Sequence, residues 1–195
     1  KSPEHTAHPG PVICDDGRRF IRRTCAVTGT PPPTLRGIEM RPPLPASFQE
    51  AAHRSFEPAT ISAVLVFPTP FWRDVNLSGF ALNPSPTREC RVSEVWDASS
   101  TEAANTPTGF CALGCAIRGD FAVDLANATR DERRKAVLAS LALVFPAPDL
   151  AKKLANDVVA YEDFVWLGSG PAGGVGGVFP PGQFAKLNPV RNMGG

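Results

Sequence analysis

Glycines that follow an apolar run are the first residues in this 195-residue sequence whose spacing suggests a chemical role. In the stretch VWLGSGPAGGVGGVFPPG, residues 165–182, Gly168, Gly170 and Gly173 match the pattern G-x-G-x-x-G. Where such glycines join a strand to a helix, a pyrophosphate binds at the helix N-terminus and an acidic residue about 20 positions later holds the ribose. The match raises the question of whether this loop binds a dinucleotide.

The surroundings of these glycines argue against a dinucleotide loop. Pro171 interrupts the pattern, and the further glycines and prolines up to residue 182 exclude a following helix. No Asp or Glu occurs after Asp163, so the ribose ligand is missing as well. Two interpretations stay open: a flexible low-complexity tail, or an ordered loop whose glycines let something flat or bulky lie against the backbone.

Cysteine and histidine residues have no spacing typical of a metal site or a disulfide framework. His5, His8 and His53 have no carboxylate or thiolate at a matching distance in the sequence, so no metal ligand is predicted. The cysteines are odd in number and form no C-x-x-C pair, which favours a cytoplasmic location over a secreted one. We expect all of them to be buried free thiols: Cys14, Cys25, Cys90, Cys111 and Cys115.

Composition limits the class of protein. A hydrophobic content of 43% with 20% charged residues predicts a globular core, and the length allows one domain, or one domain with part of another. The 20 basic and 19 acidic residues form no long run of one sign, so neither nucleic acid nor an anionic membrane is an expected partner. No apolar segment approaches the ~20 residues that a transmembrane helix needs. Because the sequence opens at Lys1 rather than Met, we expect it to be a piece of a longer protein.

Short apolar and β-branched runs predict strands between turn residues. The stretch ATISAVLVF is apolar throughout, so we expect it to be buried on both faces at the centre of a sheet. The pair Asp16-Gly17 predicts the turn of a hairpin. The predicted strands lie within residues 11–29, 59–67, 89–99, 109–117 and 160–166.

Two capping boxes predict where helices begin, Ser47 with Glu50 and Thr129 with Glu132. The helix after Thr129 carries an apolar stripe, and its basic residues are interpreted as a solvated face. The predicted helices cover 47–56, 129–145 and 149–157, with the stripe formed by Val137, Leu138, Leu141 and Phe145 and the solvated face by Arg130, Arg133, Arg134 and Lys135.

The order of these segments resembles that of the flavin monoamine oxidase family. YEDFVWLGSGPAGGVGGVFPPG is similar to the family's run of a tyrosine, acidic residues and a tryptophan, then Gly-Gly and a Pro-Gly turn beside the isoalloxazine ring. VTGTPPPTLRGIEMRPPLP and AVLVFPTPFWRDVNLSG resemble two of its strands with the motifs that follow them. VWDASS, GFCALG and ERRKAVLASLALVF stand where the family has an Asp-containing strand, a Gly-Phe strand and an Arg-rich helix, and the likeness covers about residues 12–190.

This resemblance implies an α+β fold, in which a mixed β-sheet is covered by helices as in the family's substrate-binding domain. It divides the chain into a loose lead-in, 1–10; strands like those returning from the FAD-binding domain, 11–37; a substrate-binding-type domain, 38–167; and a flavin-facing loop with a truncated tail, 168–195. The family's own glycine fingerprint and its Phe-Ala-Gly-Thr-Glu stretch are absent from the sequence. FAD is therefore implied for the complete protein, and we do not expect this chain alone to retain it.

At the site residues the sequence departs from the family. Ser62 stands where the family has a lysine that holds a water near flavin N5, and Val175 stands where it has a tyrosine of the aromatic cage. Valine offers no π face to an amine. The resemblance places Gly173, Gly174 and Val175 next to the flavin, with Gly174 at the covalent cysteine of some members. Trp166 matches a tryptophan near the flavin, although a generic buried tryptophan would look the same.

Three hypotheses for function follow. The first is a fragment of a FAD-dependent amine oxidase, inactive alone, whose complete protein oxidises a small-molecule amine with O2; its partner is a missing FAD-binding domain or a second chain. The second, favoured by the changes at Ser62 and Val175, is a non-catalytic relative that acts as a binding or interaction module. The third is an unrelated α+β domain. Because part of the interdomain contact has no partner in this sequence, we expect an exposed apolar face, and association into oligomers is possible.

Overall fold

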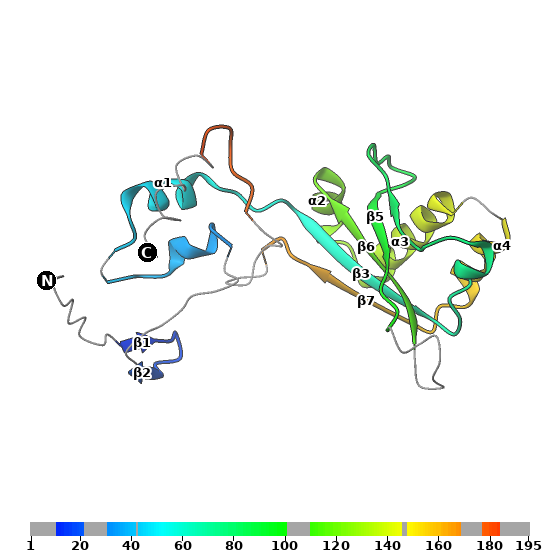
Figure 1. Ribbon diagram of the computed structural model, residues 1–195, viewed down its shortest axis with the longest axis horizontal. Helices are drawn as coiled ribbons and strands as arrows, with labels where there is room; N and C mark the ends of the chain where they lie inside the picture. The colour runs from blue at the N-terminus through cyan, green and yellow to red at the C-terminus, as the bar shows by residue number, and fades with distance from the viewer. Residues whose placement is uncertain are drawn as a thin grey trace, which may run out of the picture. The chain divides into compact units, whose positions relative to one another are not determined.

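The computed structural model describes residues 11–21, 31–41, 43–100, 110–145, 148–168 and 177–183, and the chain forms two compact units (Figure 1). One unit comprises Lys1–Phe56 with Phe179–Gly195, and the other comprises Glu57–Val178. The expected lead-in, residues 1–10, lies outside the described residues. The domain boundaries expected from the resemblance stay a prediction.

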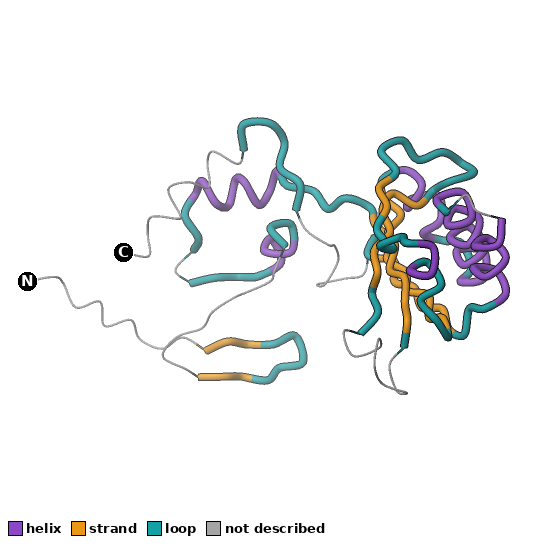
Figure 2. Tube along the Cα trace, turned by 45° about the vertical axis from the view of Figure 1, so that its right-hand side comes forward, coloured by secondary structure: helices purple, strands orange, loops and turns teal. Residues whose placement is uncertain are grey.

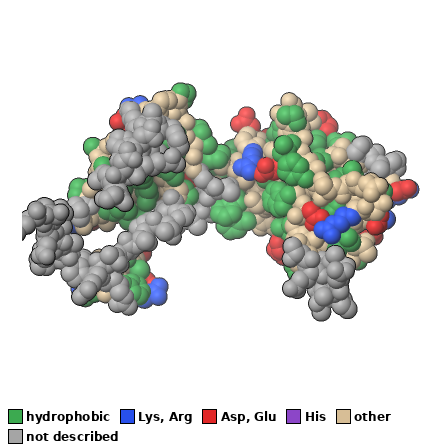
Figure 3. All heavy atoms as spheres, in the orientation of Figure 1, with side chains coloured by type: hydrophobic (Ala, Val, Ile, Leu, Met, Phe, Trp, Pro, Cys, Tyr) green, Lys and Arg blue, Asp and Glu red, His purple; other side chains and the backbone are tan. Residues whose placement is uncertain are grey.

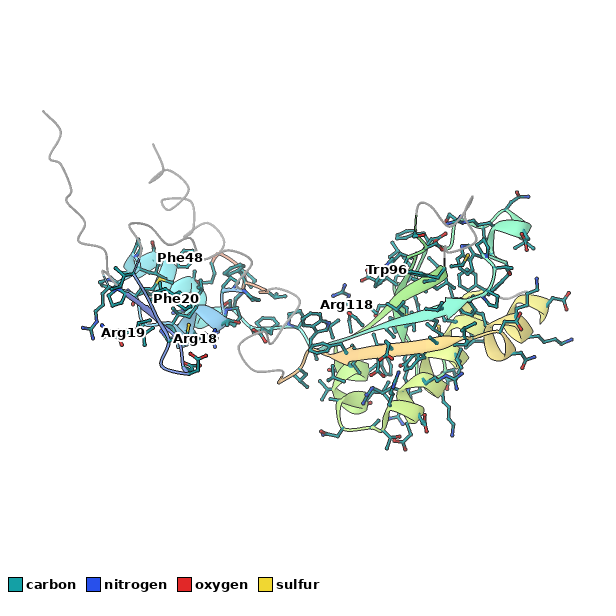
Figure 4. The ribbon with its side chains drawn as sticks, turned by 90° about the horizontal axis from the view of Figure 1, so that it is seen from below. Arg18, Arg19, Phe20, Phe48, Trp96 and Arg118 are labelled. Atoms are coloured by element: carbon teal, nitrogen blue, oxygen red, sulfur yellow. The ribbon has the colours of Figure 1, made fainter. Side chains whose placement is uncertain are left out.

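The first unit contains the predicted hairpin. Its strands are β1, Pro11–Ile13, and β2, Arg19–Ile21, and they pair antiparallel. Gly17 adopts a φ of 81°, a left-handed conformation that glycine reaches without strain, and the backbone N–H of Cys14 donates to the carbonyl of Arg18 at 2.9 Å. The Asp-Gly pair therefore makes the turn that the sequence predicted. Figure 4 labels Arg18, Arg19 and Phe20 on this hairpin.

A short 3-10 helix, η1, Thr34–Gly37, packs with the helix α1, Ala46–Arg54, in the same unit. The guanidinium of Arg36 joins them by donating to the carbonyls of Ala52, at 2.8 Å, and Ser55. This contact satisfies carbonyls at the C-terminal end of α1, which have no partner within the helix.

The capping box predicted for Ser47 and Glu50 is not formed. The helix begins at Ala46 with Pro45 as its N-cap, and no side chain caps it. Ser47 therefore lies inside the first turn, where its hydroxyl cannot act as an N-cap, and Glu50 forms an ion pair with Arg54 at 3.3 Å instead.

The second unit is built on a five-stranded sheet with the order β4-β5-β6-β3-β7. The α+β class and the covering helices agree with the expectation, and every described strand pair is antiparallel. The strand β6 lies in the middle, whereas β3, which was expected there, lies between β6 and the edge strand β7. The strands are β3, Thr60–Phe67; β4, Ala81–Leu82; β5, Val92–Asp97; β6, Cys111–Arg118; and β7, Ala160–Val165.

The pleat of β3 gives the sheet two unlike faces. Side chains from Ile61 to Phe67 at every second position are buried, and we call their side the helix face. Ser62, Val64 and Val66 point to the other side, the open face, where Val64 is 38% exposed. The expectation that this strand is buried on both faces is therefore wrong. It rested on the apolar run alone, which does not show that only every second side chain is covered by other elements.

Three helices supply the apolar side chains that cover the helix face, and Figure 2 shows them on one side of the strands. They are α2, Asp120–Ala126; α3, Arg130–Val144; and α4, Pro148–Asn156, of which α2 was not predicted. The box of Thr129 and Glu132 at the start of α3 is confirmed. A further 3-10 helix, η2, covers Arg73–Val75. Among the described residues, no helix has the length and apolar character needed to cross a membrane.

One basic residue of α3 is not on a solvated face. Arg133 forms a bidentate ion pair with Asp163 of β7, with N–O distances of 2.7 and 2.9 Å, and the two side chains are 13% and 4% exposed. The hydroxyl of Tyr161 donates to the same carboxylate at 2.8 Å. The interpretation of Arg133 as solvated is wrong, because helical spacing alone did not show that an acidic edge strand lies beneath it. The network fastens α3 to the edge of the sheet.

Replacing Arg133 by Ala should lower the free energy of unfolding by about 3 kcal/mol, because Asp163 would be left buried without its cation. Urea denaturation followed by far-UV circular dichroism measures the change. Arg134→Ala, one residue along the same helix, is the control and should change stability by less than about 0.5 kcal/mol. Equal effects of the two substitutions would contradict the anchoring role of Arg133.

A second polar anchor lies beside the aromatic cluster after β3. Phe67, Phe71 and Trp72 meet edge to face, with centroid distances of 5.2 to 5.9 Å, and all three are buried. The indole N–H of Trp72 donates to Asp97 at 3.0 Å, and Arg73 pairs with the same carboxylate at 2.7 Å. Burial alone would raise the pKa of Asp97, but hydrogen bonds from Ser99, Trp72 and Arg73 outweigh it and lower the pKa to about 2.

The lowered pKa of Asp97 makes stability depend on pH. A carboxyl group whose pKa is lower in the folded state stabilises the protein above its unfolded value of about 3.9, and this contribution disappears as the pH falls toward about 2. Asp97→Asn should therefore lower the free energy of unfolding at neutral pH by about 2 kcal/mol and flatten its decline below about pH 4. Denaturation curves on either side of this window test the prediction, and a parallel decline in both proteins would refute it.

Candidate functional site

The open face of the sheet carries the candidate site. The helices of this unit pack on the other side, and Figure 3 shows hydrophobic side chains exposed on the unit that carries the sheet. Phe164 of β7 is 49% exposed and Leu82 of β4 is 65% exposed, and both share this face with Val64 by register. The open face comprises Ser62, Val64 and Val66; Ala112, Gly114, Ala116 and Arg118; Glu94 and Trp96; Leu82; and Ala160, Glu162 and Phe164.

Two of the residues singled out from the sequence meet at one end of this face. Trp166 follows β7 directly, and its indole Nε1 donates a hydrogen bond of 3.0 Å to the hydroxyl oxygen of Ser62 on β3. Its backbone N–H donates to the carbonyl of Thr60 at 3.0 Å, which continues the pairing of β7 with β3 beyond Val165. The two residues are 104 positions apart in the sequence, and both are half-buried.

An aromatic pair lies at the same end. The rings of Phe164 and Trp166 meet edge to face with a centroid distance of 4.7 Å and an interplanar angle of 64°. Phe164 is the cross-strand partner of Ser62, so the serine lies beside both rings. This arrangement offers an apolar wall next to one hydroxyl group.

A second tryptophan lies on the open face, and no role was assigned to it from the sequence. Trp96 of β5 is the cross-strand partner of Gly114 on β6, and a Cβ at Gly114 would overlap the indole ring. The glycine is therefore required for the indole to lie against the backbone of the sheet. The alternation of side chains along β5 could have placed Trp96 on the open face, but it could not have identified Gly114 as its partner on β6.

An ion pair borders the apolar part of the face. Arg118, the last residue of β6, pairs with Glu94 of β5, and Figure 4 shows Arg118 at the end of the sheet where β3 begins and Trp96 farther along it. In the register, Glu94 is opposite Ala116, which is opposite Ser62. Glu94 and Ser62 are thus two strand spacings apart, roughly 10 Å. Neither charged residue could be singled out from the sequence, because the contact between them depends on the pairing of β5 with β6.

The remaining predicted site residues, Gly173, Gly174 and Val175, lie outside the described residues. The expectation of buried free thiols is confirmed for Cys111 and Cys115. It is wrong for Cys14 and Cys90, which are free but only half-buried, and Cys25 lies outside the described residues. Burial raises the pKa of Cys115 to about 12, so its thiol stays protonated and is a poor nucleophile. Among the residues that the structure describes, no group of His, Cys, Asp or Glu side chains is placed to hold a metal ion.

A family model described as flavin-containing amine oxidoreductase matches residues 11–192, nearly the whole sequence. The chain belongs to this family. Because the family contains flavin, FAD is the cofactor of the complete protein.

Two relatives are similar to most of this chain. An L-amino acid dehydrogenase from Synechocystis sp. is 26% identical over 162 residues, which cover 83% of this chain and 31% of the relative. A putrescine oxidase from Kocuria rosea is 30% identical over 157 residues, which cover 79% of this chain and 30% of the relative. The chain spans about a third of the length of these relatives.

Solved structures of amine oxidases share the fold. A putrescine oxidase bound to putrescine superimposes with a TM-score of 0.66 at 23% identity, over 93% of this chain and 37% of that one. Cyclohexylamine oxidase from Brevibacterium oxydans gives a TM-score of 0.65 at 23% identity, over 89% of this chain and 35% of that one. The α+β architecture is thus that of flavin-containing amine oxidases.

The described residues fit one part of a bound flavin. Trp166, Phe164 and the apolar open face can lie along a flat ring. Within the described ranges no strand passes through a glycine-rich turn into a helix to hold a diphosphate. Gly119, the N-cap residue of α2, follows β6 without a glycine fingerprint. The described residues therefore fit the ring and do not by themselves fit the whole cofactor.

Replacing Gly114 by Ala should displace the indole of Trp96 from the sheet and lower the free energy of unfolding by about 1–3 kcal/mol, because the new methyl group has no free space. Near-ultraviolet circular dichroism and urea denaturation report the two effects. Gly37→Ala is the control, since a Cβ there meets nothing within 4 Å. An unchanged tryptophan spectrum in Gly114→Ala would contradict the packing of Trp96 on the sheet.

Proposed function

We propose that this chain is the substrate-binding portion of a FAD-dependent amine oxidase and is inactive without the FAD-binding portion. The reaction is oxidative deamination: a primary amine, O2 and water give an aldehyde or a ketone, ammonia and hydrogen peroxide. The names of the two relatives, a putrescine oxidase and an L-amino acid dehydrogenase, both refer to compounds with an amino group. The meeting of Ser62 and Trp166 at one end of the open face is the observation that supports this site.

The bound flavin would accept the hydride from the carbon next to the amine nitrogen. The chain's own side chains bind and orient the amine. The indole of Trp96, lying on Gly114, and the exposed Val64 form an apolar floor that excludes water from the carbon skeleton of the substrate. Phe164 and Trp166 bound this floor at the end where Ser62 lies. Positioning of this kind brings the reacting carbon to one side of the flavin ring.

The alternative is a non-catalytic relative that uses the same sheet as a binding module. Ser62 is the observation in its favour, because its hydroxyl accepts the indole N–H of Trp166 and offers no amine group at that position. A module of this kind would keep the fold and the apolar face while losing the turnover of amines.

The purified chain, mixed with FAD and then desalted, should keep no visible flavin absorption, because its described residues offer a wall for the ring and no diphosphate site. The measurement is the absorption spectrum before and after desalting, with free riboflavin as a control for adventitious stacking. Retained flavin would contradict the proposal that part of the cofactor site is supplied from elsewhere.

A longer protein that carries this segment with an FAD-binding portion should release hydrogen peroxide when mixed with primary amines, in a peroxidase-coupled assay. Diamines, α-amino acids and cyclohexylamine form a suitable first panel. A protein that holds flavin but whose flavin no amine in the panel reduces would favour the non-catalytic alternative.

A further inference from the structure

The backbone of Trp166 is fixed by a hydrogen bond that does not involve its side chain. Its N–H donates to the carbonyl of Thr60 at 3.0 Å, one residue beyond the pair of Val165 with Ile61. The Cα of Trp166 is thus fixed by the same ladder that joins β7 to β3. A side chain on a fixed Cα needs only its two χ angles set to have one position.

Two contacts with described residues constrain those angles. The indole N–H donates to the hydroxyl oxygen of Ser62 at 3.0 Å, and the ring packs edge to face against Phe164 at 4.7 Å. Ser62 and Phe164 are cross-strand partners, so both contacts come from neighbouring positions on the open face. The ring is held on one edge by a directional bond and on one side by an aromatic surface.

The chemistry of the bond explains why a serine suits this position. The indole nitrogen is a donor only, so its partner must supply an acceptor. On the open face of β3 the neighbouring side chains at 64 and 66 are valines, which cannot accept a hydrogen bond. A lysine ammonium is also a donor only and would face the indole N–H with no acceptor between them.

We propose that Ser62 is a positioning residue whose hydroxyl locks the indole of Trp166, so that the wall offered to the flavin ring is set before the cofactor binds. The flavin part of this inference rests on the proposed function, whereas the lock itself is a property of the chain. Ser62 and Trp166 then act as one unit, and Ser62→Lys alone would release the indole instead of adding an amine to an otherwise unchanged site.

A matched pair of substitutions tests the lock. Ser62→Thr keeps the hydroxyl and Ser62→Val replaces it by a methyl group of nearly the same size, and both β-branched residues suit a strand. In the 15N-labelled chain, each indole N–H gives one signal, assigned with Trp72→Phe, Trp96→Phe and Trp166→Phe. The Trp166 indole proton should exchange with solvent about tenfold faster in Ser62→Val than in Ser62→Thr. The Trp72 signal, from the buried core, should stay unchanged and shows that each variant is folded.

A double-mutant cycle provides a second measurement that does not need slow exchange. Ser62→Thr and Ser62→Val should differ in urea midpoint when Trp166 is present. The difference should be smaller in the Trp166→Phe background, because the side chain there has no indole N–H for the hydroxyl to accept. Ser93→Ala, on β5, is the control for loss of a hydroxyl from the sheet. Equal exchange rates and equal midpoints for the Thr and Val variants would overturn the lock.

The flavin part has its own readout. In a longer protein with FAD bound, Ser62→Val should alter the visible circular dichroism of the flavin, which reports the surroundings of the ring, whereas Ser62→Thr should leave it unchanged. A released indole with an unchanged flavin spectrum would overturn the cofactor-facing role. An intact lock in a flavin-loaded protein that oxidises no amine would overturn the proposed function and leave the lock standing.

Discussion

The pairing of β3 with β6 on one side and β7 on the other is the constraint on which the sheet-bearing unit depends. Because the register is set along the full length of β3, its side chains alternate between a core covered by helices and a face left for function. A slip of one residue would bury Ser62 and expose Ile61, which is 1% exposed. The same pairings thus determine both the stability of this unit and the chemistry of its open face.

The edge strand β7 is held from both faces of the sheet, which matters because the predicted flavin-facing loop follows it. On the helix face, Asp163 is bound to Arg133 of α3. On the open face, Trp166 just beyond the strand is bound to Ser62. An edge strand has only one neighbour in the sheet, so side-chain anchors of this kind compensate for the missing ladder.

The open face combines features on which the proposed binding of a flat ring and an organic amine rests. Glycine and alanine on β6 let Trp96 lie close to the backbone, and the aromatic pair at the other side bounds the apolar area. The ion pair of Arg118 with Glu94 lies at its margin and keeps the charge balanced. Membership in the flavin-containing amine oxidoreductase family is the reason to connect this face with a flavin. The described residues alone offer no site for the diphosphate of FAD.

Local sequence determined most of the elements. The Asp16-Gly17 turn, the box of Thr129 with Glu132 and the apolar runs of β3 and β6 each depend on neighbouring residues, so their prediction held. The family could also be inferred from ordered motifs, and with it the candidate roles of Ser62 and Trp166. What only the tertiary structure decided were relations between distant segments: the bond of Trp166 to Ser62, Trp96 on Gly114, and the burial of Arg133. The physical reason is that strand register and helix packing bring such residues together, and neither leaves a signal in the spacing of residues along the chain.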